Sequence, residues 1–238
     1  EPTTCSIGMA DEDPVFETTT GPVRVITAAS LFDGHDAAIN VMRRLIQASG
    51  AEVIHLGHDQ SAQAVVDCAV QEDAHAIALT SYQGGHVEYF TYIRQLLDEA
   101  GCAHVKIFGG GGGTITPPEI RTLHQSGITK IYSPDDGRSM GLMGMIHHLM
   151  GLAAEVDLID EARLASLDGP VTVDDMAKVG MLMTLSESAD DATFKAAIET
   201  ARSSNKDVPV IGFTGTGGAG KSSLLDELML RIQRDNPG

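Results

Sequence analysis

The stretch "VRVITAASLFDGHDAAINVMRRLIQ", residues 23–47, carries the pattern that decides the fold. It opens with the β-branched run "VRVITA" and passes through a polar loop. It then continues as "DAAINVMRRLIQASG", where apolar side chains recur at helical spacing (Ile39, Met42, Leu45 and Ile46) until Gly50. A short apolar strand followed at once by an amphipathic helix is the first part of a βαβ unit.

The same alternation continues to residue 150. Four more apolar runs follow, "EVIHL", "AIALTS", "VKIF" and "KIY". Their helices are "SAQAVVDCAVQED", which Ser61 can cap, "VEYFTYIRQLLDEAG", "PPEIRTLHQSG" and "RSMGLMGMIHHLMGL". Five such units predict an α/β fold with a parallel five-stranded sheet covered by helices on both faces. We expect the doubly wound, flavodoxin-like strand order 2-1-3-4-5, with a ligand crevice between the carboxyl ends of the first and third strands.

Composition divides the chain into four parts. Residues 1–21 are polar, acidic and dotted with Pro and Gly, which predicts a flexible arm before the α/β domain of residues 22–150. Residues 151–206 are helical, acidic and without strands, which is typical of a connecting segment rather than a second core. Residues 207–238 hold the strand "VPVIGFTG" and the helix "KSSLLDELMLRIQ". This last unit needs more sheet than these residues provide, so we expect its domain to continue beyond residue 238.

Charge and cysteine content exclude several classes of function. The formal net charge of −17 argues against wrapping a nucleic-acid backbone, which needs basic patches. No apolar run reaches the roughly 20 residues that span a bilayer. Cys5, Cys68 and Cys102 are odd in number and lack CxxC spacing, which disfavours a disulfide framework and favours the cytoplasm. We expect His55 and His58 in a surface loop at a strand end rather than in a metal site.

Three loops converge on the expected crevice. Asp33, Gly34 and His35 follow the first strand, "TSYQGG" (residues 80–85) follows the third, and "GGGGG" (residues 109–113) follows the fourth. We expect Gly34 to let the chain turn sharply so that His35 points into the crevice. Five glycines cost backbone entropy, so their presence favours the close approach of a bulky ligand to one wall.

His35 is the candidate metal ligand. Asp33 and Asp36 are both placed to accept a hydrogen bond from one ring nitrogen, which makes the other nitrogen a better ligand. One histidine does not hold a bare ion tightly, but it supplies an axial bond to a metal already held by a macrocycle. The alternative is a loop histidine at the start of a helix with local hydrogen bonds only.

"DGHD", the serine-containing loop and the glycine run together resemble the DxHxxG…SxL…GG signature of cobalamin-binding domains over residues 22–150. The resemblance implies cobalamin with its nucleotide base displaced, His35 as the lower cobalt ligand, Asp33 as the orienter of its ring, and a slot for the nucleotide tail. Ala38 replaces the signature's last glycine and Gln83 its leucine, and more than one glycine pair fits the GG. The expected cofactor-binding residues are Asp33, Gly34, His35, Asp36, Ser81, Tyr82, Gln83, Gly109, Gly110, Gly111, Gly112 and Gly113.

A second motif, "GTGGAGKS" at residues 215–222, matches the phosphate-binding pattern GxxxxGK[ST] between a strand and a helix. Backbone N–H groups at the helix start would hold phosphates, Lys221 would meet the outer phosphates and Ser222 would bind Mg²⁺. The expected nucleotide-binding residues are Gly215, Gly217, Gly218, Ala219, Gly220, Lys221, Ser222 and Ser223. Nothing in the chain selects guanine over adenine.

The order of these parts resembles the family of fused isobutyryl-CoA mutases, in which a GTPase chaperone domain lies between the B12 domain and the substrate barrel. The resemblance implies adenosylcobalamin, GTP or GDP with Mg²⁺, and radical interconversion of isobutyryl-CoA and n-butyryl-CoA. Acyl-CoA would bind to a barrel downstream, and the full-length protein would be a homodimer. No catalytic residue is expected in this chain.

Two other functions fit the same loops. One is a methylcobalamin carrier domain of a methyltransferase, although such domains usually follow a helical cap that residues 1–21 are too short to form. The other is a non-catalytic module that delivers B12 or senses nucleotide. A substrate barrel after residue 238 would separate the mutase from this last alternative.

Overall fold

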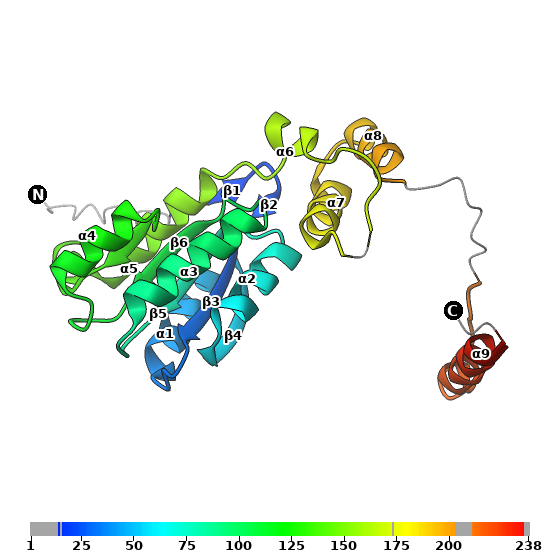
Figure 1. Ribbon diagram of the computed structural model, residues 1–238, viewed down its shortest axis with the longest axis horizontal. Helices are drawn as coiled ribbons and strands as arrows, with labels where there is room; N and C mark the ends of the chain where they lie inside the picture. The colour runs from blue at the N-terminus through cyan, green and yellow to red at the C-terminus, as the bar shows by residue number, and fades with distance from the viewer. Residues whose placement is uncertain (1–13, 15, 173, 203–210, 236–238) are drawn as a thin grey trace, which may run out of the picture. The chain divides into compact units, whose positions relative to one another are not determined.

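The structure is a computed structural model that describes residues 14, 16–172, 174–202 and 211–235. The chain divides into two compact units, residues 1–203 and residues 204–238, which are treated separately below. The α/β domain lies in the first unit (Figure 1).

The first unit is built on a parallel five-stranded sheet with the order β4-β3-β5-β6-β7. The strands are β3 (Arg24–Ser30), β4 (Glu52–Gln60), β5 (Ala76–Thr80), β6 (Lys106–Gly110) and β7 (Lys130–Tyr132). In chain order this is 2-1-3-4-5, which confirms the flavodoxin-like prediction. The connection reverses at β3, which pairs with both β4 and β5, so the crevice lies at the carboxyl ends of β3 and β5.

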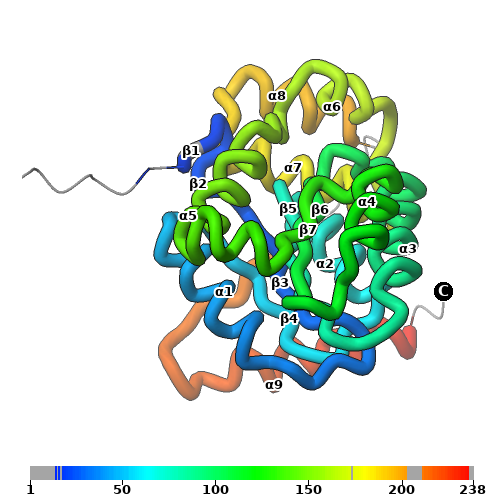
Figure 2. Tube along the Cα trace, turned by 90° about the vertical axis from the view of Figure 1, so that its left-hand side faces the viewer, coloured from blue at the N-terminus to red at the C-terminus, as the bar shows by residue number. Residues whose placement is uncertain are grey.

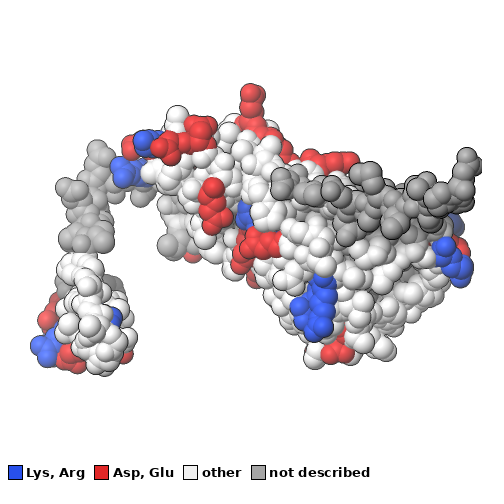
Figure 3. Space-filling view, turned by 180° about the vertical axis from the view of Figure 1, so that it is seen from behind, with Lys and Arg blue, Asp and Glu red and all other residues white. Residues whose placement is uncertain are grey.

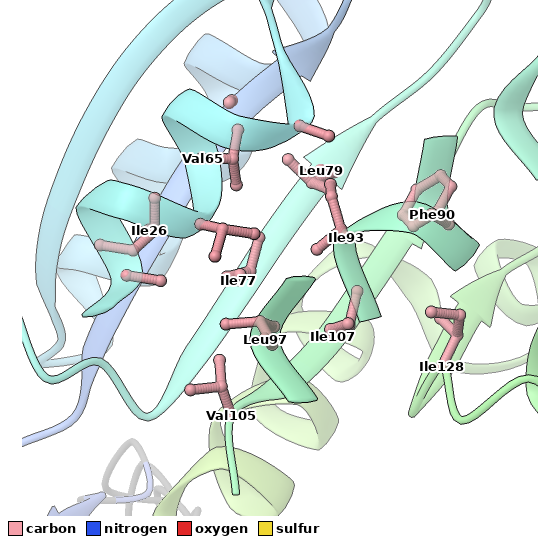
Figure 4. Packing of buried hydrophobic residues seen from close by; sticks show 14 of the residues in the cluster. Ile26, Val65, Ile77, Leu79, Phe90, Ile93, Leu97, Val105, Ile107 and Ile128 are labelled. Carbon is pink, nitrogen blue, oxygen red and sulfur yellow. The ribbon is translucent and has the colours of Figure 1, made fainter. Parts of the chain in front are cut away.

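Helices cover both faces of the sheet (Figure 2). On one face lie α2 (Ala62–Gln71), α3 (His86–Glu99) and α4 (Pro117–Gln125), and on the other lie α1 (Asp36–Ala48) and α5 (Pro134–Ala154). Figure 4 shows the core of the first face, where Val65 of α2 and Leu97 of α3 lie beside Ile77 of β5. Strands covered on both sides are apolar on both sides, as the continuous runs in the sequence predict.

The helices start where the sequence provides caps. The Ser61 hydroxyl accepts the Ala64 N–H at 3.1 Å, as expected. Capping boxes at Thr116 and Ser133 open α4 and α5, each with proline in the first turn. These caps satisfy N–H groups that have no partner inside the helix.

The boundaries of two strands differ from the predictions. β4 continues to Gln60, so His55 and His58 lie within a strand and not in a surface loop. The Thr27 hydroxyl lies 3.0 Å from His55 Nδ1 and gives that ring a partner in the neighbouring strand. β6 continues through Gly109 and Gly110, because both pair with β5 and β7, so only the last three glycines form the loop.

The expected arm, residues 1–21, lies partly outside the described residues. Its end is ordered, because β1 (Glu17–Thr18) pairs antiparallel with β2 (Gly21–Pro22). The side chain of Thr19 donates to Asp157 at 3.0 Å, which ties this hairpin to the segment after α5.

Of residues 151–206 the structure describes 151–172 and 174–202, and these form more than a connecting segment. The end of α5 is followed by α6 (Glu161–Ala165), α7 (Met176–Ser188) and α8 (Asp191–Ala201), which enclose a small cluster of buried apolar side chains. These helices are anchored to the sheet domain through buried Asp73, which accepts from Arg163 Nη2 at 2.5 Å and from the Thr184 hydroxyl at 2.8 Å. Gly180 of α7 lies so close to the end of α2 that a Cβ there would come within 2.8 Å of the Val70 carbonyl.

The second unit contains α9 (Lys221–Asp235). Part of the expected strand at residues 208–215 lies outside the described residues, and residues 211–215 are not in a strand. A strand needs a hydrogen-bonded neighbour, and none is found among the described residues of this unit.

The charged side chains of the chain are dispersed. On the face in Figure 3, Asp and Glu form several separate groups, and Lys and Arg form fewer. Among the described residues, no helix is long and apolar enough to cross a membrane.

Candidate functional site

The ring of His35 is held by Asp33 at the carboxyl end of β3. Asp33 is fully buried, whereas the His35 side chain is 62% exposed. His35 Nδ1 lies 2.7 Å from Asp33 Oδ1, and the same oxygen accepts the His35 N–H at 2.9 Å. The other oxygen, Oδ2, accepts the Tyr82 N–H at 2.6 Å. One carboxylate therefore fixes the histidine and ties the loop after β3 to the loop after β5.

The charge of Asp33 determines which ring nitrogen of His35 is free. Burial alone would raise the pKa of Asp33, but the hydrogen bonds from Tyr82 and His35 outweigh it and lower this pKa below its usual value. An ionised carboxylate only accepts, so Nδ1 donates to it, and Nε2 is the ring nitrogen that this carboxylate leaves free. The geometry that the resemblance implied for Asp33 and His35 is present.

Two other residues of this loop differ from expectation. Asp36 is the exposed first residue of α1, and within the described chain the carboxylate partner of the ring is Asp33. The prediction that Gly34 makes the sharp turn is wrong, because Gly34 is not left-handed and a Cβ there would meet no atom within 4 Å. The left-handed residue is Phe32, with φ of 63°.

The loop after β5 brings Tyr82 to the histidine. The two rings have centroids 5.4 Å apart. Ser81 is buried, its N–H donates to the Gly110 carbonyl at 2.9 Å, and its hydroxyl accepts from Ser30 at 3.0 Å. Gln83 is exposed, and its carbonyl accepts from His86 Nδ1 at 3.2 Å. Ser81 thus joins the ends of β3 and β6, while Tyr82 faces the site.

A cavity of about 580 Å³ opens beside these loops, between the sheet and helices α1 and α5. Its mainly apolar wall includes Ala38, Met42, Ala78, Phe108, Tyr132 and Leu149. Thr80 also lines it, and its buried hydroxyl has no hydrogen-bond partner among the described residues. A buried hydroxyl without a partner is costly, so Thr80 marks a place where a ligand can supply one.

Thr80 was expected in the polar loop after the third strand, but the cofactor-binding residues expected there began at Ser81. The signal was present in β5, where residues two apart face the same side of the sheet. Ala78 faces the α1 and α5 side, and Thr80 follows it on that side.

The five glycines of residues 109–113 serve different purposes. A Cβ on Gly109 would lie 2.5 Å from the Phe90 ring, and one on Gly111 would collide with the Ser81 carbonyl. These two glycines are required by the packing of the protein itself. A Cβ on Gly110 would meet only the Tyr132 carbonyl, at 3.6 Å, so it is Gly110 that keeps this part of the cavity wall bare. Gly112 is left-handed, with φ of 57°, and a Cβ on Gly113 would meet no atom within 4 Å.

In the second unit, the residues of the phosphate-binding motif precede and begin α9. Lys221 Nζ donates to the carbonyls of Gly215 and Thr216, both at 2.8 Å, so the lysine folds back over the loop. Gly218 and Gly220 are left-handed, with φ of 76° and 77°. Gly217 and Ala219 lie between them, and Ser222 and Ser223 lie in the first turn of the helix.

Comparison with known proteins shows which family this chain resembles. Residues 23–135 match the B12 binding domain. The chain is 49% identical over 222 residues to the fused isobutyryl-CoA mutase of Geobacillus kaustophilus, which covers 90% of this chain and 20% of that protein. It is 52% identical over 213 residues to the fused isobutyryl-CoA mutase of Cupriavidus metallidurans, with coverage of 90% and 19%.

A shorter relative matches the α/β domain alone. The chain is 33% identical over 115 residues to the 2-hydroxyisobutanoyl-CoA mutase small subunit of Aquincola tertiaricarbonis, covering 48% of this chain and 82% of that subunit. The chain spans about a fifth of the length of the fused relatives that it matches. The chain therefore belongs to the family of B12-binding domains, among the relatives of the fused isobutyryl-CoA mutases.

Proposed function

We propose that this chain is the cobalamin-binding and partial G-domain portion of an adenosylcobalamin-dependent acyl-CoA mutase that interconverts isobutyryl-CoA and n-butyryl-CoA. His35 would hold the cobalt of the cofactor, through Nε2. The observation that carries the proposal is the 2.7 Å contact between buried Asp33 and the Nδ1 of an exposed histidine, beside an apolar cavity.

The residues present fit cobalamin in three respects. Nε2 of His35 lies on an exposed ring whose Nδ1 is held by Asp33, and a metal ligand uses such a nitrogen in the neutral form of the ring. The cavity between α1, α5 and the sheet is apolar and has the size of a pocket for a bulky organic group. The unpartnered hydroxyl of Thr80 provides one polar contact inside it. We assign the displaced nucleotide tail to this cavity, with Gly110 and Thr80 on its wall.

When bound, adenosylcobalamin supplies radical chemistry by homolysis of its cobalt–carbon bond. The residues of this chain bind and orient. Asp33 holds the His35 ring and keeps the proton on Nδ1. Tyr82 packs beside that ring, and its backbone N–H secures the carboxylate.

We further propose that residues 215–223 bind GTP or GDP with Mg²⁺, in the chaperone domain that accompanies this mutase. Lys221 already folds over the loop, and the left-handed glycines allow successive backbone N–H groups to face an anion. Ser222 is the proposed Mg²⁺ ligand. Acyl-CoA binding by a downstream barrel, a homodimeric full-length protein and a cytoplasmic location are also proposals, and they follow from the resemblance described in the sequence analysis.

The cofactor assignment is tested by titrating the chain with cob(II)alamin under anaerobic conditions and following the visible absorbance. We expect saturable binding with a base-off, histidine-on spectrum, and we expect His35→Ala to lose it. His58→Ala removes an exposed histidine of β4 and is expected to bind as the unaltered chain does. If His35→Ala binds with the same spectrum and affinity, His35 is not the cobalt ligand.

A further inference from the structure

Phe32 has a backbone conformation and an exposure that folding does not explain. Its φ of 63° lies in the left-handed region, where bulky side chains are strained, and its side chain is 78% exposed. Because the Phe32 ring is largely exposed, folding buries little of its apolar surface. Packing therefore contributes little free energy to offset the backbone strain.

The strain is held in place by a second left-handed residue. The Phe32 N–H donates to Asp59 Oδ1 at 2.7 Å, and Asp59 itself has φ of 56°. The Asp59 N–H in turn donates to the Asp33 carbonyl at 3.3 Å. The end of β4 therefore fixes the turn at Phe32, and this turn is anchored to the residue that orients His35.

Strained residues that are fixed in this way cluster at functional sites. Phe32 lies three positions before His35 in the loop after β3, and the preceding Leu31 is 38% exposed. The loop thus offers two apolar side chains to solvent, three and four positions before the histidine with the exposed imidazole. A macrocycle bound through its central metal to that imidazole is wide, so it extends over the residues next to the histidine.

We propose that Phe32 is a contact for the cofactor: its exposed ring packs against the corrin macrocycle that His35 ligates, and the turn fixed by Asp59 is maintained to present it. This inference rests on the proposed function. It assigns to Phe32 a share of the binding free energy that is separate from the metal–nitrogen bond and from the cavity for the nucleotide tail.

The test compares Phe32→Asn with Phe32→Tyr in the full 238-residue chain, using thermal unfolding without ligand and anaerobic titration with cob(II)alamin. Asparagine tolerates the left-handed conformation, so we expect Phe32→Asn to keep or raise the midpoint of unfolding. Because it removes the apolar contact, we expect it to weaken cob(II)alamin binding about tenfold or more. Phe32→Tyr keeps the ring and should bind as the unaltered chain does.

Tyr92→Asn is the matched control, because Tyr92 is an exposed aromatic residue of α3 at 48% exposure. It should leave the affinity unchanged. If Phe32→Asn binds cob(II)alamin as tightly as the unaltered chain, the macrocycle does not cover Phe32 and the inference is overturned. The exposed ring would then be a contact for a protein surface instead. The proposed function would still stand in that case, provided that His35→Ala loses binding. If the unaltered chain does not bind cob(II)alamin, both proposals fail together.

Discussion

At the scale of single residues, the site depends on how one buried carboxylate divides its hydrogen bonds. Asp33 accepts two N–H groups from the backbone and one from the His35 ring, and every one of these comes from a loop at the carboxyl end of the sheet. The ring therefore cannot rotate without breaking a charge-assisted hydrogen bond. This arrangement prepares Nε2 for a metal before any ligand arrives.

Asp33→Asn is expected to weaken cob(II)alamin binding by about 10- to 100-fold, because residues that orient a metal ligand typically contribute that much to affinity. The amide keeps an oxygen for one contact but loses the charge that favours the proton on Nδ1. Affinity is measured by absorbance titration, with unfolding midpoints as a check on folding. Asp36→Asn is the matched control and should bind normally, since Asp36 is exposed at the start of α1. Equal affinities for both variants would contradict the role of Asp33.

The sequence predicted the pair Asp33 and His35 but not the geometry of their neighbours. Asp33 and Asp36 lie on either side of His35 in sequence. Only the direction in which the helix starts decides which of the two contacts the ring. A sharp turn was expected at Gly34, yet the left-handed residue of this loop is Phe32, whose N–H donates to Asp59 Oδ1. Asp59 is distant in sequence, so no local pattern indicates this bond.

At the scale of elements, strand alternation explains the glycine run. As a sequence, "GGGGG" gives no reason to distinguish its members. In the structure, β6 continues through the first two, so Gly109 faces Phe90 in the core and Gly110 faces the other side, where the cavity is. The order of strands and helices was predictable from apolar periodicity, whereas this division needed the true end of β6.

Gly110→Ala and Gly109→Ala therefore have opposite expected effects. Alanine at position 110 adds a methyl group to the cavity wall without a clash, so the free energy of unfolding should stay unchanged or rise slightly while cob(II)alamin binding weakens. Alanine at position 109 meets the Phe90 ring and Ile131, so it should cost about 1–3 kcal/mol of stability. Urea unfolding and absorbance titration on both variants check this. If Gly110→Ala binds cob(II)alamin with unchanged affinity, the nucleotide tail does not occupy this cavity.

At the scale of the whole first unit, the helices after α5 are joined to the sheet domain through buried ionisable groups. Asp73 pairs with Arg163 of α6, and His104 Nε2 lies 4.0 Å from the same carboxylate. Arg24 Nη2 donates to the Thr184 hydroxyl of α7 at 2.9 Å. The acidic, helical composition of this segment predicted a connector. The contacts with the sheet domain were missed, because composition does not reveal which distant residue a buried arginine contacts.

This network makes stability depend on pH. His75, whose Nδ1 accepts the Arg24 N–H at 3.0 Å, also belongs to this network. Burial, followed by the charges of nearby arginines, lowers the pKa of His75 and of His104 to about 4, from 6.5. Between these values the unfolded chain binds more protons than the folded one, so the stability of the first unit should fall as the pH drops from 6.5 to 4. Urea unfolding of the chain at several pH values in this window measures the effect. His104→Gln removes one titrating group, so its curve should be flatter, and an equal slope would contradict the account.

Whether His35 binds cobalt is decided by electron paramagnetic resonance of the chain reconstituted anaerobically with cob(II)alamin. Spectra are recorded with natural-abundance protein and with ¹⁵N-histidine-labelled protein. We expect the nitrogen splitting of the cobalt hyperfine lines to change on labelling, and His35→Ala to abolish this change. A spectrum that is the same with and without the label would place the nucleotide base or no nitrogen on cobalt, and would contradict the account.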